Sequence, residues 1–355
     1  MTAPNTPIEM LEYPLCYPGP GCVLVRITCT TICGSDIHTH SGRRTSPVPI
    51  ILGHEITGIV EAIGSGDIRD MKDTPVSIGD RITWTLTDTC GKCRFCNEPG
   101  LSMKCRHVRK YGHDRCDCPP HFKGGFAEYC FITPGTRIVK LPGALTDEAA
   151  APANCALSTI IAGFDAACVA PLHNILIMGA GALGFYAAAL ASFSGMKRVI
   201  VADRSRVRLE KIKSFGATHT INTEDVTPES FVAEVKALTE GFGADRVLET
   251  AGAPSLIPLG LKSLRIGGVF AEIGCSFPDA HFTYDASDII WRRLTLTGVH
   301  NYEPRHLQQA VDFLNQAGNR FPFSEIVTHK VSLSDVNKGL ELAANEDSIR
   351  VAVLP

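Results

Sequence analysis

Four closely spaced cysteines are the most conspicuous group in this chain with the potential for chemistry. Cys90, Cys93, Cys96 and Cys105 follow the pattern C-x2-C-x2-C-x8-C. The tight spacings disfavour disulfides, and a redox-active C-x-x-C pair would leave two of the cysteines without a role. Four thiolates complete the tetrahedral shell of one zinc ion, which then has no open position for a substrate. The spacing therefore predicts a structural zinc, and a metal that does chemistry must be bound elsewhere.

A glycine-rich stretch, GAGALG, indicates a dinucleotide site. It follows the apolar run NILIM and opens a predicted helix, which is the context that the G-x-G-x-x-G motif requires. Gly179 permits the tight turn, Gly181 lets the backbone approach a pyrophosphate, and Gly184 lets the helix pack on the strand. Asp203 ends the second strand, where a carboxylate can bind a ribose hydroxyl and repel a 2′-phosphate. This favours NAD over NADP, although the neighbouring Arg204 could accept a phosphate.

Three further residues could form a second metal site. Cys33 lies in CGSDIH, His54 in GHE, and Cys155 in APANCALST. Taken singly, Cys33 would be a small buried hydrophobe and His54 a core histidine with its hydrogen bonds satisfied. In a chain that also has a dinucleotide site and a four-cysteine lobe, the three residues together suggest a metal site. Two thiolates and one imidazole leave a fourth zinc position for water or substrate, which is the composition of a catalytic zinc site.

The elements that must position these residues fall into two patterns along the chain. From residue 23 to about 140, alternating apolar and polar residues with glycine punctuation predict strands. After residue 147, strands alternate with helices, which predicts a doubly wound parallel sheet. We therefore expect an α/β protein. Helices are predicted at 148–167, 182–195, 206–217, 228–243, 255–268, 303–318 and 335–347, and strands at 174–178, 198–205, 219–222, 244–252, 268–274, 293–301 and 350–355.

Bulk composition narrows the function classes. A chain of 355 residues with 45% hydrophobic and 20% charged residues is expected to form two globular domains. A net charge of −3 gives no reason to expect nucleic acid or a membrane surface as a partner. The start MTAPNTPIEM has no basic region followed by an apolar one, so we expect no secretory signal. The 14 cysteines are then expected to be thiols or metal ligands in the cytoplasm.

Together, CGSDIH, GHE, the four-cysteine lobe and GAGALG resemble the zinc-dependent alcohol dehydrogenases of the medium-chain dehydrogenase/reductase superfamily. The resemblance covers nearly the whole chain. It implies a GroES-like β-rich catalytic domain (1–155 and 300–355, with the lobe at 88–106) and a Rossmann NAD-binding domain (156–299). It also implies an active site between the domains and a homodimer or homotetramer. CRHVRKYGH and APANCA are most similar to dehydrogenases associated with phosphonate catabolism.

The resemblance also implies residue roles and cofactors. Two zinc ions per chain and NAD are expected, with hydride passing between an alcohol and the nicotinamide. Cys33, His54 and Cys155 match the ligands of the catalytic zinc. Asp36 matches the carboxylate that orients His54, and Glu55 a carboxylate beside the zinc. The remaining positions fall into two groups. The proton relay is matched by Ser35 and His38, and contacts with the cofactor by Thr159, Leu183 and Arg208.

The substrate is less well determined by the sequence. SGRRTS and CRHVRKYGH carry Arg43, Arg44, Arg106, Arg109 and Lys110, which could hold a phosphonate, phosphate or carboxylate if they face the zinc, or could simply be a solvated basic surface. Alternatively, Trp84, Leu86 and Tyr111 could line a pocket for a neutral secondary or cyclic alcohol. A non-catalytic NAD- and zinc-binding protein, or a reductase that has lost its zinc, is the alternative from another class.

Three features depart from the family pattern. The spacing before Cys105 is one residue longer than usual, so we expect the loop 97–104 to bulge. The segment before Cys33 is short, so the first strand is expected to be missing or altered. Cys116 and Cys118 have no evident role.

Overall fold

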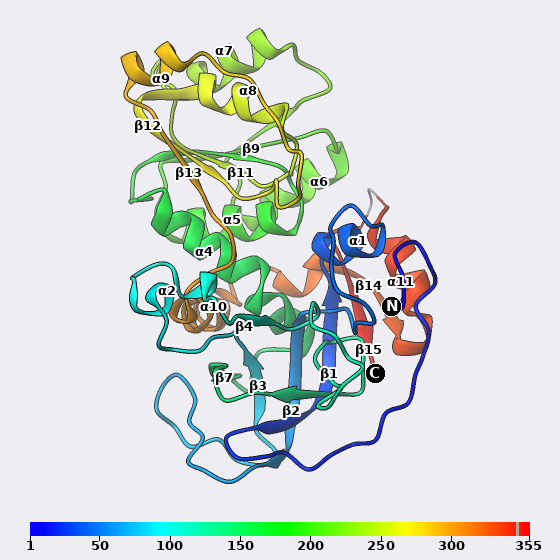
Figure 1. The fold of residues 1–355 in the computed structure, drawn as a ribbon. Helices are drawn as coiled ribbons and strands as arrows, with labels where there is room; N and C mark the ends of the chain where they lie inside the picture. Colours follow the sequence, from blue (N-terminus) through cyan, green and yellow to red (C-terminus); the bar gives the residue numbers. More distant parts are fainter. Residues whose placement is uncertain (346–347) are drawn as a thin grey trace. The chain divides into compact units, whose positions relative to one another are not determined.

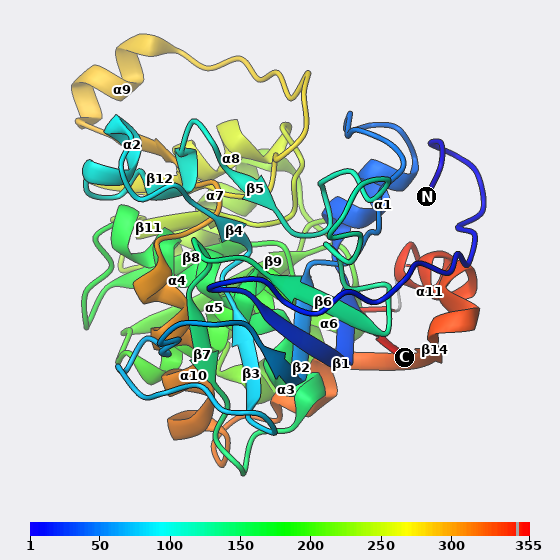
Figure 2. The same cartoon turned by 60° about the horizontal axis from the view of Figure 1, so that its bottom comes forward.

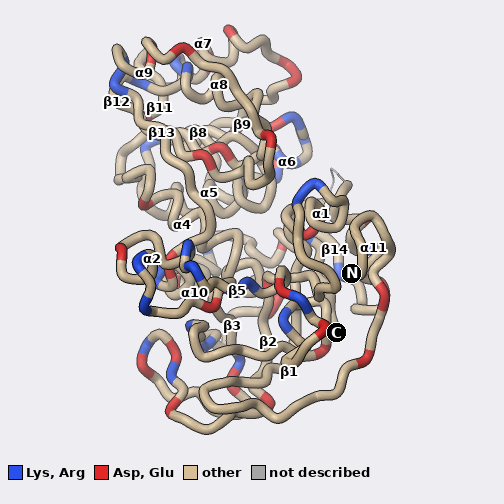
Figure 3. The backbone as a smooth tube through the Cα atoms, in the orientation of Figure 1, with Lys and Arg blue, Asp and Glu red and all other residues tan. Residues whose placement is uncertain are grey.

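The computed structural model describes residues 1–345 and 348–355, and the chain forms two compact units. The first unit comprises residues 1–158, 302–318 and 323–355. The second comprises residues 159–301 and 319–322. Within the described residues, no helix is both long enough and apolar enough to cross a bilayer. Lysines, arginines, aspartates and glutamates are interspersed along both units (Figure 3).

A seven-stranded sheet forms the framework of the first unit (Figure 1). Its central strand, β1 (Val23–Ile32), pairs antiparallel with three other strands. The side chains of β1 are almost all buried because both faces of the sheet are covered. The order is β14 (Val327–Ser332), β15 (Arg350–Leu354), β1 (Val23–Ile32), β2 (Glu55–Ile63), β3 (Arg81–Trp84) and β7 (Ile138–Lys140), with β6 (Tyr129–Ile132) also paired to β1. Two apolar clusters flank this sheet, one centred on Trp84 and one on Ile32.

Short elements complete the first unit, and α11 packs against β14 and β15 (Figure 2). The four-cysteine region carries a two-stranded ribbon of β4 (Thr87–Asp88) and β5 (Arg109–Lys110), with α2 (Arg94–Asn97) and η1 (Ser102–Lys104) between them. The other elements are α1 (Gly34–His40), α3 (Asp147–Ala150), η2 (Ala151–Asn154), α10 (Pro304–Ala317), η4 (Phe323–Ile326), η5 (Leu333–Asp335) and α11 (Val336–Ala343). Residues 1–22 contain no strand, so the first strand of the chain is β1.

The second unit is a six-stranded sheet in which every pairing is parallel. Its order is β10 (His219–Asn222), β9 (Arg198–Asp203), β8 (Asn174–Met178), β11 (Ala244–Glu249), β12 (Leu264–Glu272) and β13 (Thr295–Gly298). Helices cover both faces, with α5 on the opposite face from α7 and α8 (Figure 1). The helices are α4 (Ala156–Ala166), α5 (Ala182–Phe193), α6 (Arg206–Lys211), η3 (Ile212–Phe215), α7 (Pro228–Leu238), α8 (Leu256–Ser263) and α9 (Ala286–Arg292). The predicted doubly wound parallel sheet is confirmed, in the Rossmann strand order.

The structure departs from the predicted elements at several points. The single helix predicted at 148–167 is broken into α3, η2 and α4, because Pro152 cannot continue an α-helix and Cys155 adopts a non-helical backbone. β12 begins at Leu264, inside the predicted helix 255–268. α9 and β14 were not predicted. The helix predicted at 335–347 is α11, and residues 346–347 lie outside the described residues.

Candidate active site

Cys33, His54 and Cys155 meet in the first unit although they are far apart in the sequence. Cys33 follows β1, His54 precedes β2, and Cys155 lies at the break between η2 and α4. The two sulfur atoms and one imidazole nitrogen all lie within 4.8 Å of one another. A soft thiolate–imidazole–thiolate set at this separation suits a zinc ion with one position left open.

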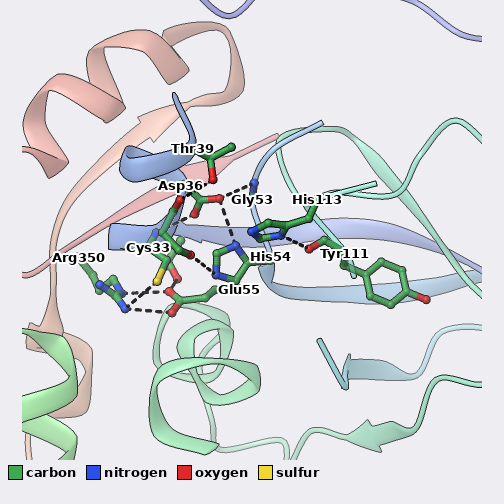
Figure 4. Close-up of polar contacts among 11 residues, drawn as sticks. Cys33, Asp36, Thr39, Gly53, His54, Glu55, Tyr111, His113 and Arg350 are labelled. Carbon is green, nitrogen blue, oxygen red and sulfur yellow. Dashed lines mark hydrogen bonds and ion pairs between the residues drawn. The ribbon is translucent and has the colours of Figure 1, made fainter. Parts of the chain in front are cut away.

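Asp36 fixes the orientation of His54 (Figure 4). The Nδ1 of His54 donates to a carboxylate oxygen of Asp36 at 3.1 Å, while the amides of Cys33 and Gly53 donate to the same carboxylate at 2.9 and 3.2 Å. Asp36 is fully buried. Because Nδ1 is engaged, Nε2 of His54 is the nitrogen available for a metal. Ser35 places its hydroxyl 3.3 Å from that Nε2.

Glu55 lies under this group and is paired with Arg350, a residue that the sequence analysis missed. The guanidinium reaches both carboxylate oxygens of Glu55 at 3.0 Å, and its Nη2 lies 3.6 Å from the sulfur of Cys33 (Figure 4). A hydrogen bond from Cys155, together with the charge of Arg350, holds the pKa of Cys33 well below its ordinary value despite burial. The only feature of the sequence that could have indicated this role of Arg350 is its position as the one charged residue of the apolar C-terminal stretch RVAVLP.

Buried hydrogen bonds fix the backbone immediately before Cys155. Tyr302 donates its hydroxyl to the carbonyl of Asn154 and accepts from the amide of Leu86 at 3.0 Å. The side-chain amide of Asn154 donates to the carbonyl of Trp84 at 3.1 Å. Tyr302 therefore anchors the segment that carries Cys155.

The expected proton-relay residues lie on one face of α1. Ser35 and His38 are three residues apart, which places their side chains on adjacent turns of the helix. Burial and the charge of Arg43 lower the pKa of His38, while the nearby Cys33 raises it. His38 is therefore half-buried close to the group formed by Cys33, His54 and Cys155.

The basic residues that the sequence offers either as substrate contacts or as a solvated surface divide into two sets. Arg43, Arg106 and Arg109 are exposed, whereas Arg44 and Lys110 are half-buried. The proposed apolar lining is wrong for all three residues: Trp84 and Tyr111 belong to a core cluster, and Leu86 is also buried in the interior. The exposed fractions are 0% for Trp84, 2% for Leu86 and 5% for Tyr111.

The four cysteines of the lobe converge as a tetrahedral site requires. The sulfurs of Cys90 and Cys96 are 3.9 Å apart, those of Cys93 and Cys96 3.6 Å, and those of Cys93 and Cys105 3.9 Å. Zinc–sulfur bonds of about 2.3 Å give sulfur–sulfur edges of about 3.8 Å in a tetrahedron. The loop 97–104, which we expect to bulge, contains Gly100 between α2 and η1 with a φ of 79°.

The glycine loop of the second unit has the space that a dinucleotide needs. A Cβ at Gly184 would lie 1.9 Å from the carbonyl oxygen of Gly179, so the helix packs too closely for any side chain. A Cβ at Gly181 would meet nothing within 4 Å, so its backbone faces open space. The hydroxyl of Thr250 donates towards the carbonyls of Met178 and Gly179 at 3.0 and 3.1 Å, a support that the sequence analysis missed.

Asp203 faces this loop from the end of β9. One of its carboxylate oxygens accepts from the amide of Ala180 at 2.6 Å, and the other accepts from the amide of Ser205 at 2.8 Å. The other expected cofactor residues are half-buried, Thr159 on α4, Leu183 on α5 and Arg208 on α6.

A second acidic pair, also missed by the sequence analysis, lies at the ends of β11 and β12. Glu249 accepts hydrogen bonds from the amides of Ala251 and Gly252, each at 2.9 Å. A carboxylate oxygen of Glu249, a carboxylate oxygen of Glu272 and the sulfur of Cys275 all lie within 4.8 Å of one another. Burial and the charge of Glu272 raise the pKa of Glu249 to about 8.

Comparison with known proteins agrees with this geometry. Residues 19–143 match the alcohol dehydrogenase GroES-like domain, and residues 182–316 match the zinc-binding dehydrogenase domain. The chain is 31% identical over 342 residues to 5-exo-hydroxycamphor dehydrogenase of Pseudomonas putida, covering 94% of this chain and 92% of that protein.

Two solved structures share the whole fold. The crystal structure of an alcohol dehydrogenase from Thermotoga maritima superposes with a TM-score of 0.95 at 28% identity, covering 100% of this chain and 97% of that one. A zinc-binding dehydrogenase from Sinorhizobium meliloti, solved bound to NADP, has a TM-score of 0.84 at 26% identity, covering 95% and 93%. The predicted GroES-like and Rossmann folds are confirmed, and the findings support alcohol oxidoreduction with zinc and a nicotinamide cofactor. The chain belongs to the zinc-dependent alcohol dehydrogenase family of the medium-chain dehydrogenase/reductase superfamily.

Proposed function

We propose that this protein interconverts an alcohol and its aldehyde or ketone by hydride transfer with NAD(H), at a zinc ion held by Cys33, His54 and Cys155. The observation that carries the proposal is the convergence of these three donor atoms within 4.8 Å. When bound, zinc supplies a Lewis acid that lowers the pKa of an alcohol hydroxyl. A non-catalytic binding protein would have no need for a metal site of this composition with an open fourth position.

The chain's own residues prepare this site. Asp36 holds the imidazole of His54 by Nδ1, which leaves Nε2 to bind a zinc ion and raises the basicity of that nitrogen. Ser35, with its hydroxyl 3.3 Å from His54 Nε2, would take the alcohol proton and pass it to His38 one turn further along α1. Glu55 and Arg350 offset each other's buried charge beneath the site.

We further propose that the second unit binds NAD in preference to NADP. Gly179, Gly181 and Gly184 would receive the pyrophosphate at the N-terminus of α5. The carboxylate of Asp203 would accept the ribose hydroxyls and repel a 2′-phosphate. Further contacts would come from Thr159, Leu183 and Arg208.

The two units then take the roles expected from the sequence, with a catalytic domain (1–155 and 300–355) and an NAD-binding domain (156–299). The four-cysteine lobe (88–106) would hold a second, structural zinc, so that each chain carries two. The sulfur–sulfur distances of 3.6 to 3.9 Å support this assignment.

For the substrate, we favour a small alcohol that carries an anionic group, with an organophosphonate as one candidate. Arg44 and Lys110, half-buried on the first unit, support this choice. The alternative is a neutral secondary, cyclic or polyol alcohol, and a relative named for 5-exo-hydroxycamphor keeps it open.

We also propose that the protein works as a homodimer or homotetramer. β13 is an edge strand of the six-stranded sheet, and its neighbour α9 exposes Ile290 and Trp291 by 72% and 79%. Unpaired strand edges and exposed apolar side chains favour pairing with a second copy.

The test combines metal analysis with an NAD-reduction assay over a panel of alcohols. His54→Ala and Cys155→Ala should reduce turnover at least a thousandfold, lower the zinc content from two ions per chain to one, and leave NAD affinity unchanged. Cys118→Ala, at an exposed cysteine, is the matched control and should retain both zinc ions and full activity. Retention of activity by His54→Ala would refute the assignment, and a wild type with only the lobe zinc would favour the non-catalytic alternative.

A further inference from the structure

Lys110 is a cation held close to the metal ligands without a partner for its charge. It is half-buried on β5, and its ammonium makes no hydrogen bond or ion pair with any residue in the part of the chain that the structure describes. Arg109, the preceding residue on the same strand, is exposed. Successive side chains on a strand point to opposite faces, so β5 directs Lys110 inward and Arg109 outward.

Lys110 lies within electrostatic range of two of the proposed zinc ligands, Cys33 and Cys155. Its charge interacts with the cation of Arg44 and with Cys155, Cys33 and Asp36. Burial and Arg44 lower the pKa of Lys110 to about 8, while the thiolates and the carboxylate raise it.

Nearby, His113 provides a geometric link to the zinc ligands. His113 follows β5, and its ring centroid lies 5.2 Å from that of His54 (Figure 4). Its Nδ1 donates to the carbonyl of Tyr111 at 3.0 Å, so the ring is fixed against the metal site. The segment that begins at Lys110 therefore reaches the zinc-ligand candidate His54 at His113.

Arg44 is the second unpaired cation of this region. It is half-buried on the loop after α1, and its amide donates to the carbonyl of His38 at 3.0 Å. Its guanidinium forms no ion pair or hydrogen bond among the residues that the structure describes. It lowers the pKa values of both Lys110 and His113, so its charge lies within electrostatic range of both side chains.

Two cations that repel each other in a partly desolvated space are costly unless an anion joins them. The same unit shows the paired arrangement, because Arg350 is neutralised by Glu55 at 3.0 Å. No carboxylate of the described residues forms such a pair with Lys110 or Arg44. Neither cation therefore has a directly paired carboxylate, and an anionic ligand would supply one.

Building on the proposed function, we propose that Lys110 and Arg44 are specificity-determining residues that bind an oxyanion on the alcohol substrate, at a position remote from the reacting hydroxyl. Lys110 offers a compact point charge, and Arg44 offers a planar fork for two oxygens. Both carboxylate and phosphoryl groups have this chemistry. The arginines at 43, 106 and 109 are exposed and belong to the solvated surface.

The decisive experiment compares alcohols that differ only in charge. The kcat/KM for NAD reduction would be measured with 2-hydroxyethylphosphonate, 3-hydroxypropanoate and neutral 1-propanol, using the wild type, Lys110→Met, Arg44→Met and the control Arg109→Met. Each of the first two variants should lower the ratio of anionic to neutral kcat/KM by about tenfold to a hundredfold, as expected for one charge-assisted hydrogen bond. Arg109→Met should change this ratio less than twofold. The two anionic alcohols distinguish a phosphoryl preference from a carboxylate preference.

Two kinetic outcomes would overturn the inference. An equal loss with all three alcohols would assign Lys110 to the reacting oxygen, and an unchanged ratio with unchanged NAD affinity would assign both cations to the surface. A weakened NAD affinity in Lys110→Met, with an unchanged ratio, would assign the charge to the cofactor and would also overturn it.

A binding readout separates this inference from the proposed function. Titration calorimetry of methylphosphonate into the zinc-loaded, NAD-saturated protein should show binding that Lys110→Met weakens at least tenfold and Arg109→Met leaves unchanged. Binding of this kind without turnover of any alcohol would refute the dehydrogenase proposal and support the anion site. Turnover of neutral alcohols with no methylphosphonate binding would refute the anion site and support the dehydrogenase.

Discussion

Arg350 forms a bidentate ion pair with Glu55, a residue 295 positions away in the sequence. Its Nε lies 3.0 Å from one carboxylate oxygen, and its Nη2 lies 3.0 Å from the other. Glu55 opens β2 and Arg350 opens β15, and both strands flank or border β1, which ends at the zinc ligand Cys33. The pair therefore links the N-terminal and C-terminal segments of the first unit next to Cys33. The side chain of Glu55 is completely buried there, with an exposed fraction of 0%.

Removing one partner of this pair should destabilise the protein strongly. Arg350→Met leaves a buried carboxylate without its counter-charge, and we expect the free energy of unfolding to fall by about 3–5 kcal/mol. Urea denaturation of the zinc-loaded protein measures this change. Arg26→Met is a suitable control, because Arg26 and Glu61 form an exposed pair at 3.5 Å whose loss should cost less than about 1 kcal/mol.

The double variant Arg350→Met with Glu55→Gln tests the cause of that loss. Because Gln carries no charge, the double variant should be more stable than Arg350→Met alone by at least about 1 kcal/mol. If the two substitutions instead destabilise additively, lost packing rather than an uncompensated charge explains the effect.

The lobe cysteines should control one zinc ion and only one. Cys96→Ser removes a thiolate from the closed shell, so we expect the zinc content to fall from two ions per chain to one and the lobe to become sensitive to proteolysis. Elemental analysis of the purified protein gives the metal count. Cys118→Ser should retain two ions, and a Cys96→Ser protein that also retains two would contradict the assignment.

Asp203 should determine the choice of dinucleotide. Asp203→Asn keeps an acceptor for the amide of Ala180 but removes the negative charge. We expect the ratio of kcat/KM for NADP to that for NAD to rise by about tenfold to a hundredfold, because a 2′-phosphate is no longer repelled. Glu210→Gln, at an exposed site on α6, should leave the ratio unchanged. An unchanged ratio in Asp203→Asn would place the discrimination elsewhere.

Glu249 and Glu272 should make stability depend on pH. The pKa of Glu249 in the folded protein, about 8, lies above its ordinary value, so the folded state holds a proton that the unfolded state releases. Stability is therefore highest below the ordinary pKa and falls as pH rises towards 8, by up to about 1.4 kcal/mol per pH unit. Cys275 faces the same pair, and its pKa is raised to about 12 by burial and by Glu272.

Glu272→Gln removes the like charge and should flatten this dependence. Urea midpoints measured from pH 5 to pH 8 should decline less steeply in Glu272→Gln than in the wild type, and the variant should be the more stable of the two at pH 8. Glu224→Gln, at an exposed position, should follow the wild type. Parallel curves for Glu272→Gln and the wild type would show that the two carboxyl groups are not coupled.

Much of the architecture could be predicted because its signals are local. The G-x-G-x-x-G loop, its flanking strand and helix, and the alternation that follows depend on residues close together in sequence, and the parallel sheet then follows from chain connectivity. The four lobe cysteines lie within 16 positions, so their spacing alone restricts them to one site. Where the prediction failed, as in the helix 148–167, a local apolar pattern was interrupted by a proline and by the demands of a tertiary site.

Only the tertiary structure decided which polar residues reach the metal site. Nothing near Arg350 in the sequence indicates Glu55 as its partner, because the pair depends on β15 and β2 both lying beside β1. The same holds for Tyr302, which anchors the backbone before Cys155 through a contact spanning 148 positions. Sequence could list five basic residues as candidates for binding substrate, but it could not choose among them. In the folded chain, Lys110 and Arg44 are half-buried, whereas the arginines at 43, 106 and 109 are exposed. This difference arises only on folding, because packing determines which side of a strand or loop faces the interior.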